Sequence, residues 1–171
     1  MKDPNVDSSE LRPATADDEN FLITVYKSSR GDDLRGLGWD ENRINEFLEM
    51  QYQAQRTFDQ SDYGRATDEI ILCSGQRAGR LLADFREDEI RCVDLSLLPE
   101  YRNRGLGTLL VRKLQKQASA AQKPLRVQII RFSRAVKLFE RLGFSRTSET
   151  GTHFQMEWKP GSVGSAPVSE D

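Results

Sequence analysis

The sequence predicts an α/β (α+β) fold in which flanking helices cover a mixed, mostly antiparallel central sheet. Strand-like segments at 69–73, 79–85 and 89–97 follow one another across short polar turns, a spacing typical of an antiparallel meander. A helical pattern at 106–120 then lies between the strand segments 89–97 and 125–130. Such a crossover joins two parallel strands, so the sheet is expected to contain one parallel pair.

The first part of the chain reads as one short strand followed by two helices. Leu11 to Ala14 is the strand, and Thr15 to Asp18 resembles a capping box at the start of a helix. A glycine-rich connection at 31–39 follows, and Asp40 is placed to cap the second helix. The apolar positions at helical spacing are Phe21, Leu22, Val25 and Tyr26 in the first helix and Ile44, Phe47, Leu48 and Tyr52 in the second.

The last part reads as helix, strand, helix and strand. Pro124 ends the helix at 106–120 because proline cannot continue one. Ser133 can cap the next helix, and Gly143 is a natural stop. The strand at 154–158 closes the order β-α-α-β-β-β-α-β-α-β. The apolar face expected on the helix at 106–120 consists of Leu106, Leu109, Leu110, Leu114 and Ala118.

The composition fits one soluble globular domain. The chain has 171 residues, of which 37% are hydrophobic and 30% charged, an ordinary balance. We expect a single domain at 10–158 between disordered tails at 1–9 and 159–171, the second rich in Gly, Ser and Pro. The polar N-terminus and the absence of a long apolar run favour a cytoplasmic protein without membrane contact. Cys73 and Cys92 read as reduced core thiols, and no metal site is expected.

Charge is divided unevenly along the chain. Residues 1–101 carry a net charge of −10, whereas residues 102–146 carry +11. The basic part suits an anionic ligand and the acidic part a cationic one. Solvated helix faces explain the same counts equally well.

The turn before the helix at 106–120 has the features of an anion site. Pro99 takes the chain out of the sheet, and Gly105 and Gly107 allow a tight turn. The first helical turn offers unpaired amides at its positive end, beside Arg102 and Arg104. A helix N-terminus with two convenient glycines is the simpler alternative. Neither a dinucleotide-binding fingerprint nor a P-loop is present.

Two blocks resemble the GNAT (Gcn5-related N-acetyltransferase) superfamily. Arg102-Asn-Arg-Gly-Leu-Gly107 is similar to its Arg/Gln-x-x-Gly-x-Gly/Ala turn, preceded by a matching strand end at 95–99. Ala135 to Phe144 resembles its Ala-x-x-Leu-Tyr-x-x-x-Gly-Phe segment. The order and spacing agree, and the resemblance covers about residues 11–158. It implies transfer of an acetyl group from acetyl-CoA to an amine by direct attack in a ternary complex.

The resemblance also implies where coenzyme A binds. Backbone groups of Leu95 and Leu97 pair with the pantetheine arm, which lies where the two parallel strands splay apart. Arg134 and Lys137 meet the far phosphates or the pantetheine arm. The pyrophosphate is held by the Arg102 region with Arg104 and by the amides of Gly105, Leu106, Gly107 and Thr108.

The pattern departs from the family where acid catalysis is expected. Phe139 replaces a frequent Tyr, and phenylalanine cannot donate a proton to the leaving thiolate. The Asn that commonly opens that helix is also missing, since residues 131–133 read Arg-Phe-Ser. Ser133 is therefore a candidate at the thiol, although a plain helix cap explains it as well.

Asp94 is the first candidate for the base or the substrate contact, because it lies on the strand expected to line the cleft. A solvent-facing position in that strand is its alternative. Asp84 is a weaker candidate of the same kind. Histidine is the side chain whose ordinary pKa suits proton transfer near neutral pH, but a solvent-facing histidine at the start of the last strand, such as His153, needs no catalytic role.

The acceptor is expected to be a primary amine of a small molecule or peptide. Selectivity is assigned to the loop at 31–39, with Asp32, Asp33, Asp40 and Glu41 as the acidic groups and Tyr26, Tyr52 and Trp39 as aromatic candidates. A catalytically weak acyl-CoA-binding or regulatory module is the alternative, motivated by Phe139. A nucleic-acid surface at 102–146 is disfavoured because its aromatic residues lie in apolar contexts. The sequence leaves a homodimer open.

Overall fold

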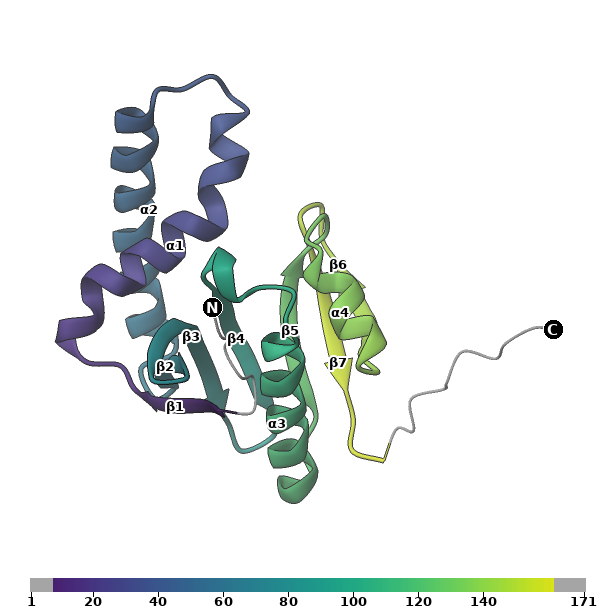
Figure 1. Cartoon of the computed structure of the whole chain (residues 1–171). Helices are drawn as coiled ribbons and strands as arrows, with labels where there is room; N and C mark the ends of the chain where they lie inside the picture. Colours follow the sequence, from purple (N-terminus) through teal and green to yellow (C-terminus); the bar gives the residue numbers. More distant parts are fainter. Residues whose placement is uncertain (1–7, 162–171) are drawn as a thin grey trace. The chain divides into compact units, whose positions relative to one another are not determined.

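The structure is a computed structural model and describes residues 8–161 (Figure 1). Residues 1–7 and 162–171, which belong to the tails predicted as disordered, lie outside the described residues. None of the helices between residues 8 and 161 has the length and apolar character needed to cross a bilayer. The described chain divides into two compact units, residues 8–84 with 94–106 and residues 85–93 with 107–161. The expectation of a single domain therefore stays a prediction.

Seven strands form one sheet in the order β1-β2-β3-β4-β5-β7-β6 within the described chain. β4 and β5 pair in parallel, with Ile90 opposite Leu125. β1 with β2, β2 with β3, β5 with β7 and β6 with β7 pair antiparallel. The predicted mixed and mostly antiparallel sheet is thus confirmed. The strands are β1 (Ser9–Pro13), β2 (Thr67–Cys73), β3 (Gln76–Phe85), β4 (Ile90–Leu97), β5 (Leu125–Ile130), β6 (Ser145–Glu149) and β7 (His153–Trp158).

The first unit contains helices α1 (Glu19–Arg35) and α2 (Glu41–Asp62), which pack together (Figure 1). Their apolar stripes meet the sheet in a core cluster of Leu22, Tyr52 and Ile70. Burial of each such aliphatic side chain contributes about 1.5–3 kcal/mol. The predicted caps form: the Arg43 amide donates to Asp40 at 2.9 Å, and the Thr15 amide donates to Asp18 at 2.9 Å, at the start of the 3-10 helix η2 (Ala16–Asp18).

The prediction of a glycine-rich connection beginning at Gly31 is wrong. α1 continues to Arg35, so Gly31, Asp32 and Asp33 are helical. Gly31 is buried, and a Cβ at this position would lie 3.9 Å from a Leu48 methyl carbon in α2. The glycine therefore lies in the contact between the two helices, where a methyl group would also make an ordinary van der Waals contact with Leu48.

The second unit contains α3 (Leu106–Ala121), which begins at the unit boundary, and α4 (Ala135–Arg141). Leu110, Leu114 and Ala118 of α3 are buried as predicted, but Leu109 is 38% exposed and does not belong to the buried face. β6 was not among the predicted strands. All five of its residues are exposed, so it lacks the alternation of apolar and polar residues that marks a strand.

Candidate active site

The chain leaves β4 at Leu97 and reaches α3 through a short ordered turn. The 3-10 helix η3 (Pro99–Tyr101) comes first, and Asn103 and Gly105 then adopt positive φ angles of 59° and 84°. Glycine reaches this left-handed conformation without the steric cost that other residues meet. A Cβ at Gly105 would find no atom of residues 8–161 within 4 Å. The turn thus leaves open space directly before the free amides of the first helical turn.

Arg102 holds this turn to the rest of the first unit. Its Nε donates to the Leu97 carbonyl at 2.9 Å, and Nη2 lies 3.4 Å from the Ser28 carbonyl in α1. The expected phosphate-binding guanidinium is therefore engaged with backbone carbonyls. Arg104, by contrast, is exposed.

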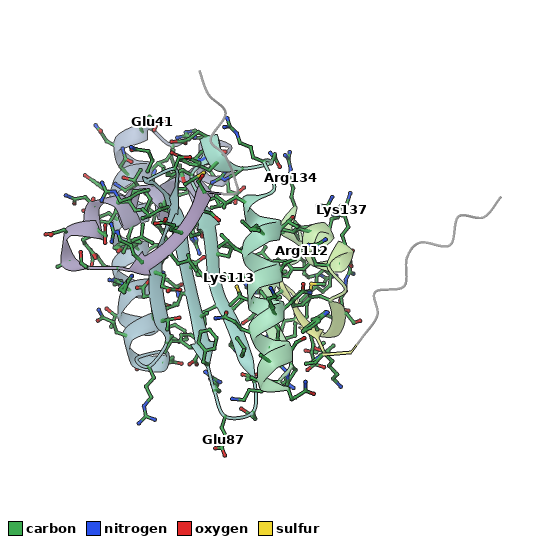
Figure 2. All side chains as sticks on the ribbon, turned by 60° about the horizontal axis from the view of Figure 1, so that its bottom comes forward. Glu41, Glu87, Arg112, Lys113, Arg134 and Lys137 are labelled. Carbon is green, nitrogen blue, oxygen red and sulfur yellow. The ribbon has the colours of Figure 1, made fainter. Side chains whose placement is uncertain are left out.

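In the second unit, the start of α3 lies against α4. A Cβ at Gly107 would lie 3.7 Å from a methyl carbon of Leu138. Arg134 and Lys137, the two cations expected to reach the cofactor, are exposed at the beginning of α4. Figure 2 labels these two side chains and those of Arg112 and Lys113, which project on opposite sides of α3. All four cations are exposed, and this positive charge suits an anionic ligand.

Ser133 and Phe139, the two positions considered for a proton donor, differ in whether a hydroxyl proton is present. The Ser133 hydroxyl oxygen accepts a hydrogen bond from the Ala135 amide at 3.2 Å, which keeps the hydroxyl proton available. Arg134 occupies the N-cap position itself, one residue later than predicted. Phe139 is buried at 4% exposure, and its ring lies 5.0 Å from that of Phe144 in an edge-to-face contact.

Asp94 is held at both carboxylate oxygens within the first unit. The Ser96 hydroxyl donates to Oδ1 at 2.6 Å, and Nη1 of Arg80 lies 3.4 Å from Oδ2. The Asp94 side chain is nevertheless 36% exposed, so a ligand can reach it. Leu95 and Leu97, the expected pantetheine contacts, are partly buried on either side of Ser96.

Arg80 of β3 lies at the centre of a cluster of carboxylates. Its Nε and Nη2 bind the two oxygens of Asp68 at 2.8 and 3.0 Å, and its Nη1 lies 3.3 Å from Asp59 of α2. Burial alone would lower the pKa of Arg80, but hydrogen bonding to Asp68 and the fields of all three carboxylates raise it above its ordinary value. The pKa of Asp68 is lowered despite burial, because Arg80 and then Arg56 stabilise its charged form.

Sequence reasoning did not find Arg80 and Asp59, although a signal was present. Asp59 continues the buried stripe of α2, seven positions after Tyr52, where an apolar residue is the rule. Arg80 lies inside the apolar run of β3 and is 8% exposed. Two opposite charges at positions predicted to be buried indicate a pair, because a buried charge needs a partner.

Tyr26 and Tyr52 lie beside this cluster. Their rings are 5.5 Å apart. Burial, together with Asp94 and Asp59, raises the pKa of Tyr26 against the opposing effect of Arg30. Burial and the neighbouring Glu19 raise the pKa of Tyr52 to about 12. Both phenols therefore stay protonated near neutral pH.

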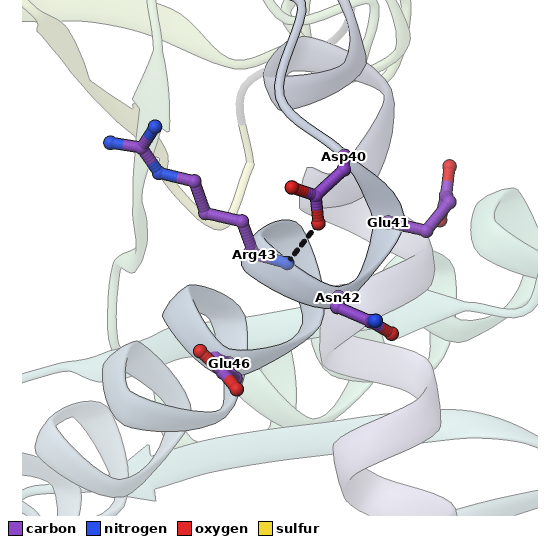
Figure 3. A pocket seen from close by; sticks show the side chains of 5 residues that line it. All are labelled: Asp40, Glu41, Asn42, Arg43 and Glu46. Carbon is purple, nitrogen blue, oxygen red and sulfur yellow. Dashed lines mark hydrogen bonds between the residues drawn. The ribbon is translucent and has the colours of Figure 1, made fainter.

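The remaining acidic and aromatic candidates lie at the start of α2 or in strands. A shallow depression of about 440 Å³ is lined by Asp40, Glu41, Asn42, Arg43 and Glu46 (Figure 3). It contains none of the predicted cofactor residues. Trp39 packs edge-on to Phe47 at 5.3 Å with Arg43 over its ring. Asp84 is buried in β3, and the His153 ring lies 2.7 Å from the Thr152 hydroxyl.

The family comparison matches the middle of the chain. A family model described as an acetyltransferase (GNAT) domain matches residues 65–146. This segment belongs to the GNAT family. It includes β2 to α4 and therefore the turn at Gly105, Asp94 and Arg80. The GNAT segment also contains both motifs on which the resemblance was based.

Solved structures extend the likeness to nearly the whole chain, at the level of the fold. The PaiA N-acetyltransferase of Thermoplasma acidophilum in complex with coenzyme A is 20% identical, with a TM-score of 0.69 over 89% of this chain and 99% of that one. The ribosomal-protein-S18-alanine N-acetyltransferase of Escherichia coli is 16% identical, with a TM-score of 0.62 over 92% and 97%. An acetyltransferase of Thermus thermophilus is 16% identical, with a TM-score of 0.64 over 88% and 96%. No curated protein is similar enough in sequence to match.

Proposed function

We propose that this protein is an acetyl-CoA-dependent N-acetyltransferase that acetylates a primary amine by direct attack in a ternary complex. One observation carries the proposal: within the GNAT segment, the turn at Gly105 has a left-handed backbone and open space before the first turn of α3. The similar fold of PaiA, whose structure contains coenzyme A, supports the same cofactor.

The cofactor is proposed to bind mainly through backbone groups. The amides of Gly105, Leu106, Gly107 and Thr108 hold the pyrophosphate, since a helix N-terminus provides unpaired donors and a favourable dipole. Backbone groups of Leu95 and Leu97 pair with the pantetheine arm. Arg104, Arg134 and Lys137 supply exposed positive charge. Arg102 acts indirectly, because its guanidinium fixes the turn through Leu97 and Ser28.

The reaction requires one bond to form and one to break at the thioester carbonyl. The amine nitrogen attacks the carbonyl carbon, and the carbon–sulfur bond then breaks to release the coenzyme A thiolate. Asp94 takes the proton that the amine loses, and its exposed carboxylate suits this role. Ser133, whose hydroxyl proton is not used in its bond with the Ala135 amide, is the proposed donor to the thiolate, and its oxygen regains a proton from water. The orientation of the two substrates supplies much of the acceleration.

A catalytically weak acyl-CoA-binding module is the second candidate function. Phe139 favours it, because a buried phenylalanine packed on Phe144 offers no proton where the family often has a tyrosine. This candidate shares the cofactor site with the first and differs from it in turnover. Acetylation of any amine at a rate that depends on Asp94 would exclude it.

Calorimetry tests the cofactor part of the proposal. Acetyl-CoA, coenzyme A and 3′-dephospho-CoA are titrated into the wild type, into Gly105→Glu and into Gly75→Glu. Gly75 is the matched control, because it also has a positive φ, 78°, and a Cβ there also meets no atom of residues 8–161 within 4 Å. We expect binding in the wild type and the control and its loss in Gly105→Glu, where a carboxylate opposes the phosphates. Equal binding by both variants would overturn the assignment of the turn.

Turnover is then measured as thiol release from acetyl-CoA with a panel of primary amines. Asp94→Asn is compared with the wild type, and the acetylated amine is identified by mass spectrometry. We expect the substitution to lower kcat by about 10²–10⁴-fold, the range for loss of a general base. Unchanged turnover in Asp94→Asn would remove Asp94 from the mechanism without affecting the cofactor site.

A further inference from the structure

Arg80 shares its guanidinium among three carboxylates that differ in exposure. Nε and Nη2 are occupied by Asp68. The third nitrogen, Nη1, does not contact Asp68 and lies 3.3 Å from Asp59 and 3.4 Å from Asp94. Asp59 is 5% exposed, whereas the Asp94 side chain is 36% exposed. The half-buried Asp68 and the buried Asp59 therefore hold the guanidinium, and the guanidinium faces Asp94, the most exposed of the three carboxylates.

This arrangement fixes the orientation of the Asp94 carboxylate. The guanidinium is planar and rigid, so a two-point contact with Asp68 determines where Nη1 lies. Nη1 then defines the position of Asp94 Oδ2, and the Ser96 hydroxyl defines that of Oδ1 at 2.6 Å. A base that is held in one orientation transfers protons more efficiently than a freely rotating one.

The charges around Asp94 do not cancel. Four carboxylates face two guanidinium groups in this cluster, since Arg56 pairs with Asp68 at 2.8 Å and lies 3.6 Å from Glu19. One further guanidinium, that of Arg30, lies nearby over the Tyr26 ring at 4.0 Å. Tyr26 from α1 and Ser96 from β4 are the uncharged polar neighbours of Asp94. The surplus is negative, so a cationic amine at Asp94 would compensate it. The members are Glu19, Arg56, Asp59, Asp68, Arg80 and Asp94.

We propose that Arg80 is a positioning residue that orients Asp94 toward the acceptor amine. The proposal rests on the proposed acetyltransferase function. Arg80 is 8% exposed, so it acts through Asp94 and not on the substrate. Asp68 and Asp59 contribute to this positioning, because they hold the guanidinium of Arg80 in place.

The competing explanation is an ion cluster that serves stability alone. Both explanations predict that loss of Arg80 destabilises the protein, because three carboxylates would remain without their shared cation. They differ in whether the effect on the reaction requires Asp94. A double-mutant cycle measures this dependence directly.

The cycle combines Arg80→Lys with Asp94→Asn. Lysine keeps the charge but not the planar fork. Turnover is measured with acetyl-CoA and the amine that gives the highest rate, at a mildly alkaline pH, where more amine is unprotonated and the Asp94→Asn background stays measurable. We expect Arg80→Lys to lower kcat about tenfold or more, as misplacement of a catalytic group does, while coenzyme A affinity by calorimetry is unchanged. In the Asp94→Asn background, the same substitution is expected to have no further effect.

Two further variants serve as an alternative and as a control in this experiment. Asp68→Asn keeps Arg80 but removes one charge from its two-point contact, so it serves if Arg80→Lys does not fold, and its effect must also vanish in Asp94→Asn. Arg77→Lys is the control, because Arg77 lies on the same strand and pairs with Asp18 at 3.3 Å, outside the cluster. We expect its kcat to equal that of the wild type.

The outcomes separate the two proposals. Equal losses in the wild-type and Asp94→Asn backgrounds, in an enzyme that acetylates amines, would overturn the role of Arg80 alone. A loss of thermal stability in Arg80→Lys with unchanged kcat would do the same. A wild-type protein that binds acetyl-CoA but acetylates no amine would remove both the proposed transferase function and the positioning role.

Discussion

Gly79 offers a test of how closely β3 and β4 approach each other in the first unit. A Cβ at this position would overlap the Ser96 carbonyl oxygen and would lie 3.0 Å from both Cα and Cδ2 of Leu97. Side chains can rotate away from a new methyl group, but a backbone carbonyl in a paired strand cannot. The hydrogen bond from the Leu98 amide to the Ala78 carbonyl, 2.8 Å long, ties the strands together at this point. Gly79→Ala must therefore displace β4.

The cost follows from the contacts. Overpacking by one carbon in a well-packed region costs about 1–3 kcal/mol. For a chain of this length, each kcal/mol lowers Tm by about 2–4 °C, so we expect Gly79→Ala to lower Tm by about 2–12 °C. The displaced strand carries Ser96 and Asp94, and turnover is expected to fall beyond any loss of folded protein.

Thermal unfolding followed by circular dichroism measures the change, with turnover assayed well below Tm. Gly151→Ala is the matched control, because its Cβ would meet no atom of residues 8–161 within 4 Å. A Gly79→Ala protein with the Tm and kcat of the control would refute the reasoning. The two strands would then have room that the structure does not show.

Three further predictions concern single residues and the acceptor. The pKa of the Asp18 carboxyl is held well below its usual range, chiefly by hydrogen bonds from Arg12. It therefore stabilises the fold above about pH 4 and loses this effect as the pH falls. Asp18→Asn should lower the free energy of unfolding by about 2 kcal/mol near neutral pH. Thermal melts should show that the Tm of the variant depends less on pH between about 4 and 2 than that of the wild type, and an equally steep dependence in the variant would contradict this prediction. Phe139→Tyr should raise kcat about tenfold or more, because the tyrosine hydroxyl can donate a proton. The substitution should lower the free energy of unfolding by about 1–2 kcal/mol because the ring is buried. An unchanged kcat would exclude a proton donor at this position. Paired assays of phenethylamine and phenylalanine should give the amino acid a kcat/KM lower by about tenfold, since Asp94 repels its carboxylate; equal values would disprove that repulsion.

Local patterns were sufficient to predict most of the fold. The capping residue Asp40, the stripe of α2 and the break at Pro124 determine element boundaries through interactions a few residues apart, and the structure places these boundaries within a few positions of the prediction. The parallel pair β4 and β5 followed from the helix that connects the two strands as a crossover. The turn from Arg102 to Gly107 was singled out by its resemblance to the GNAT motif, which the family match at residues 65–146 includes, and its role in binding the cofactor stays a prediction.

What the sequence did not reveal depends on partners far along the chain. β6 has no buried residue, so only its pairing with β7 makes it a strand. Asp59 and Arg80 are 21 positions apart, and although each is a charge at a position predicted to be buried, neither shows by itself which residue is its partner. Gly31 reads as a helix breaker, yet contact with α2 outweighs its low helix propensity of about 1 kcal/mol.

The guanidinium of Arg102 has a consequence for how the two substrates influence each other. Because one rigid group is bonded to both the Leu97 carbonyl and the Ser28 carbonyl, the end of β4 and the middle of α1 share a single mechanical link. Any coupling that this link transmits between a ligand at the turn and a ligand at the helix must be reciprocal, so each would change the affinity for the other by the same factor. Replacement of Arg102 would remove this link between the turn and α1.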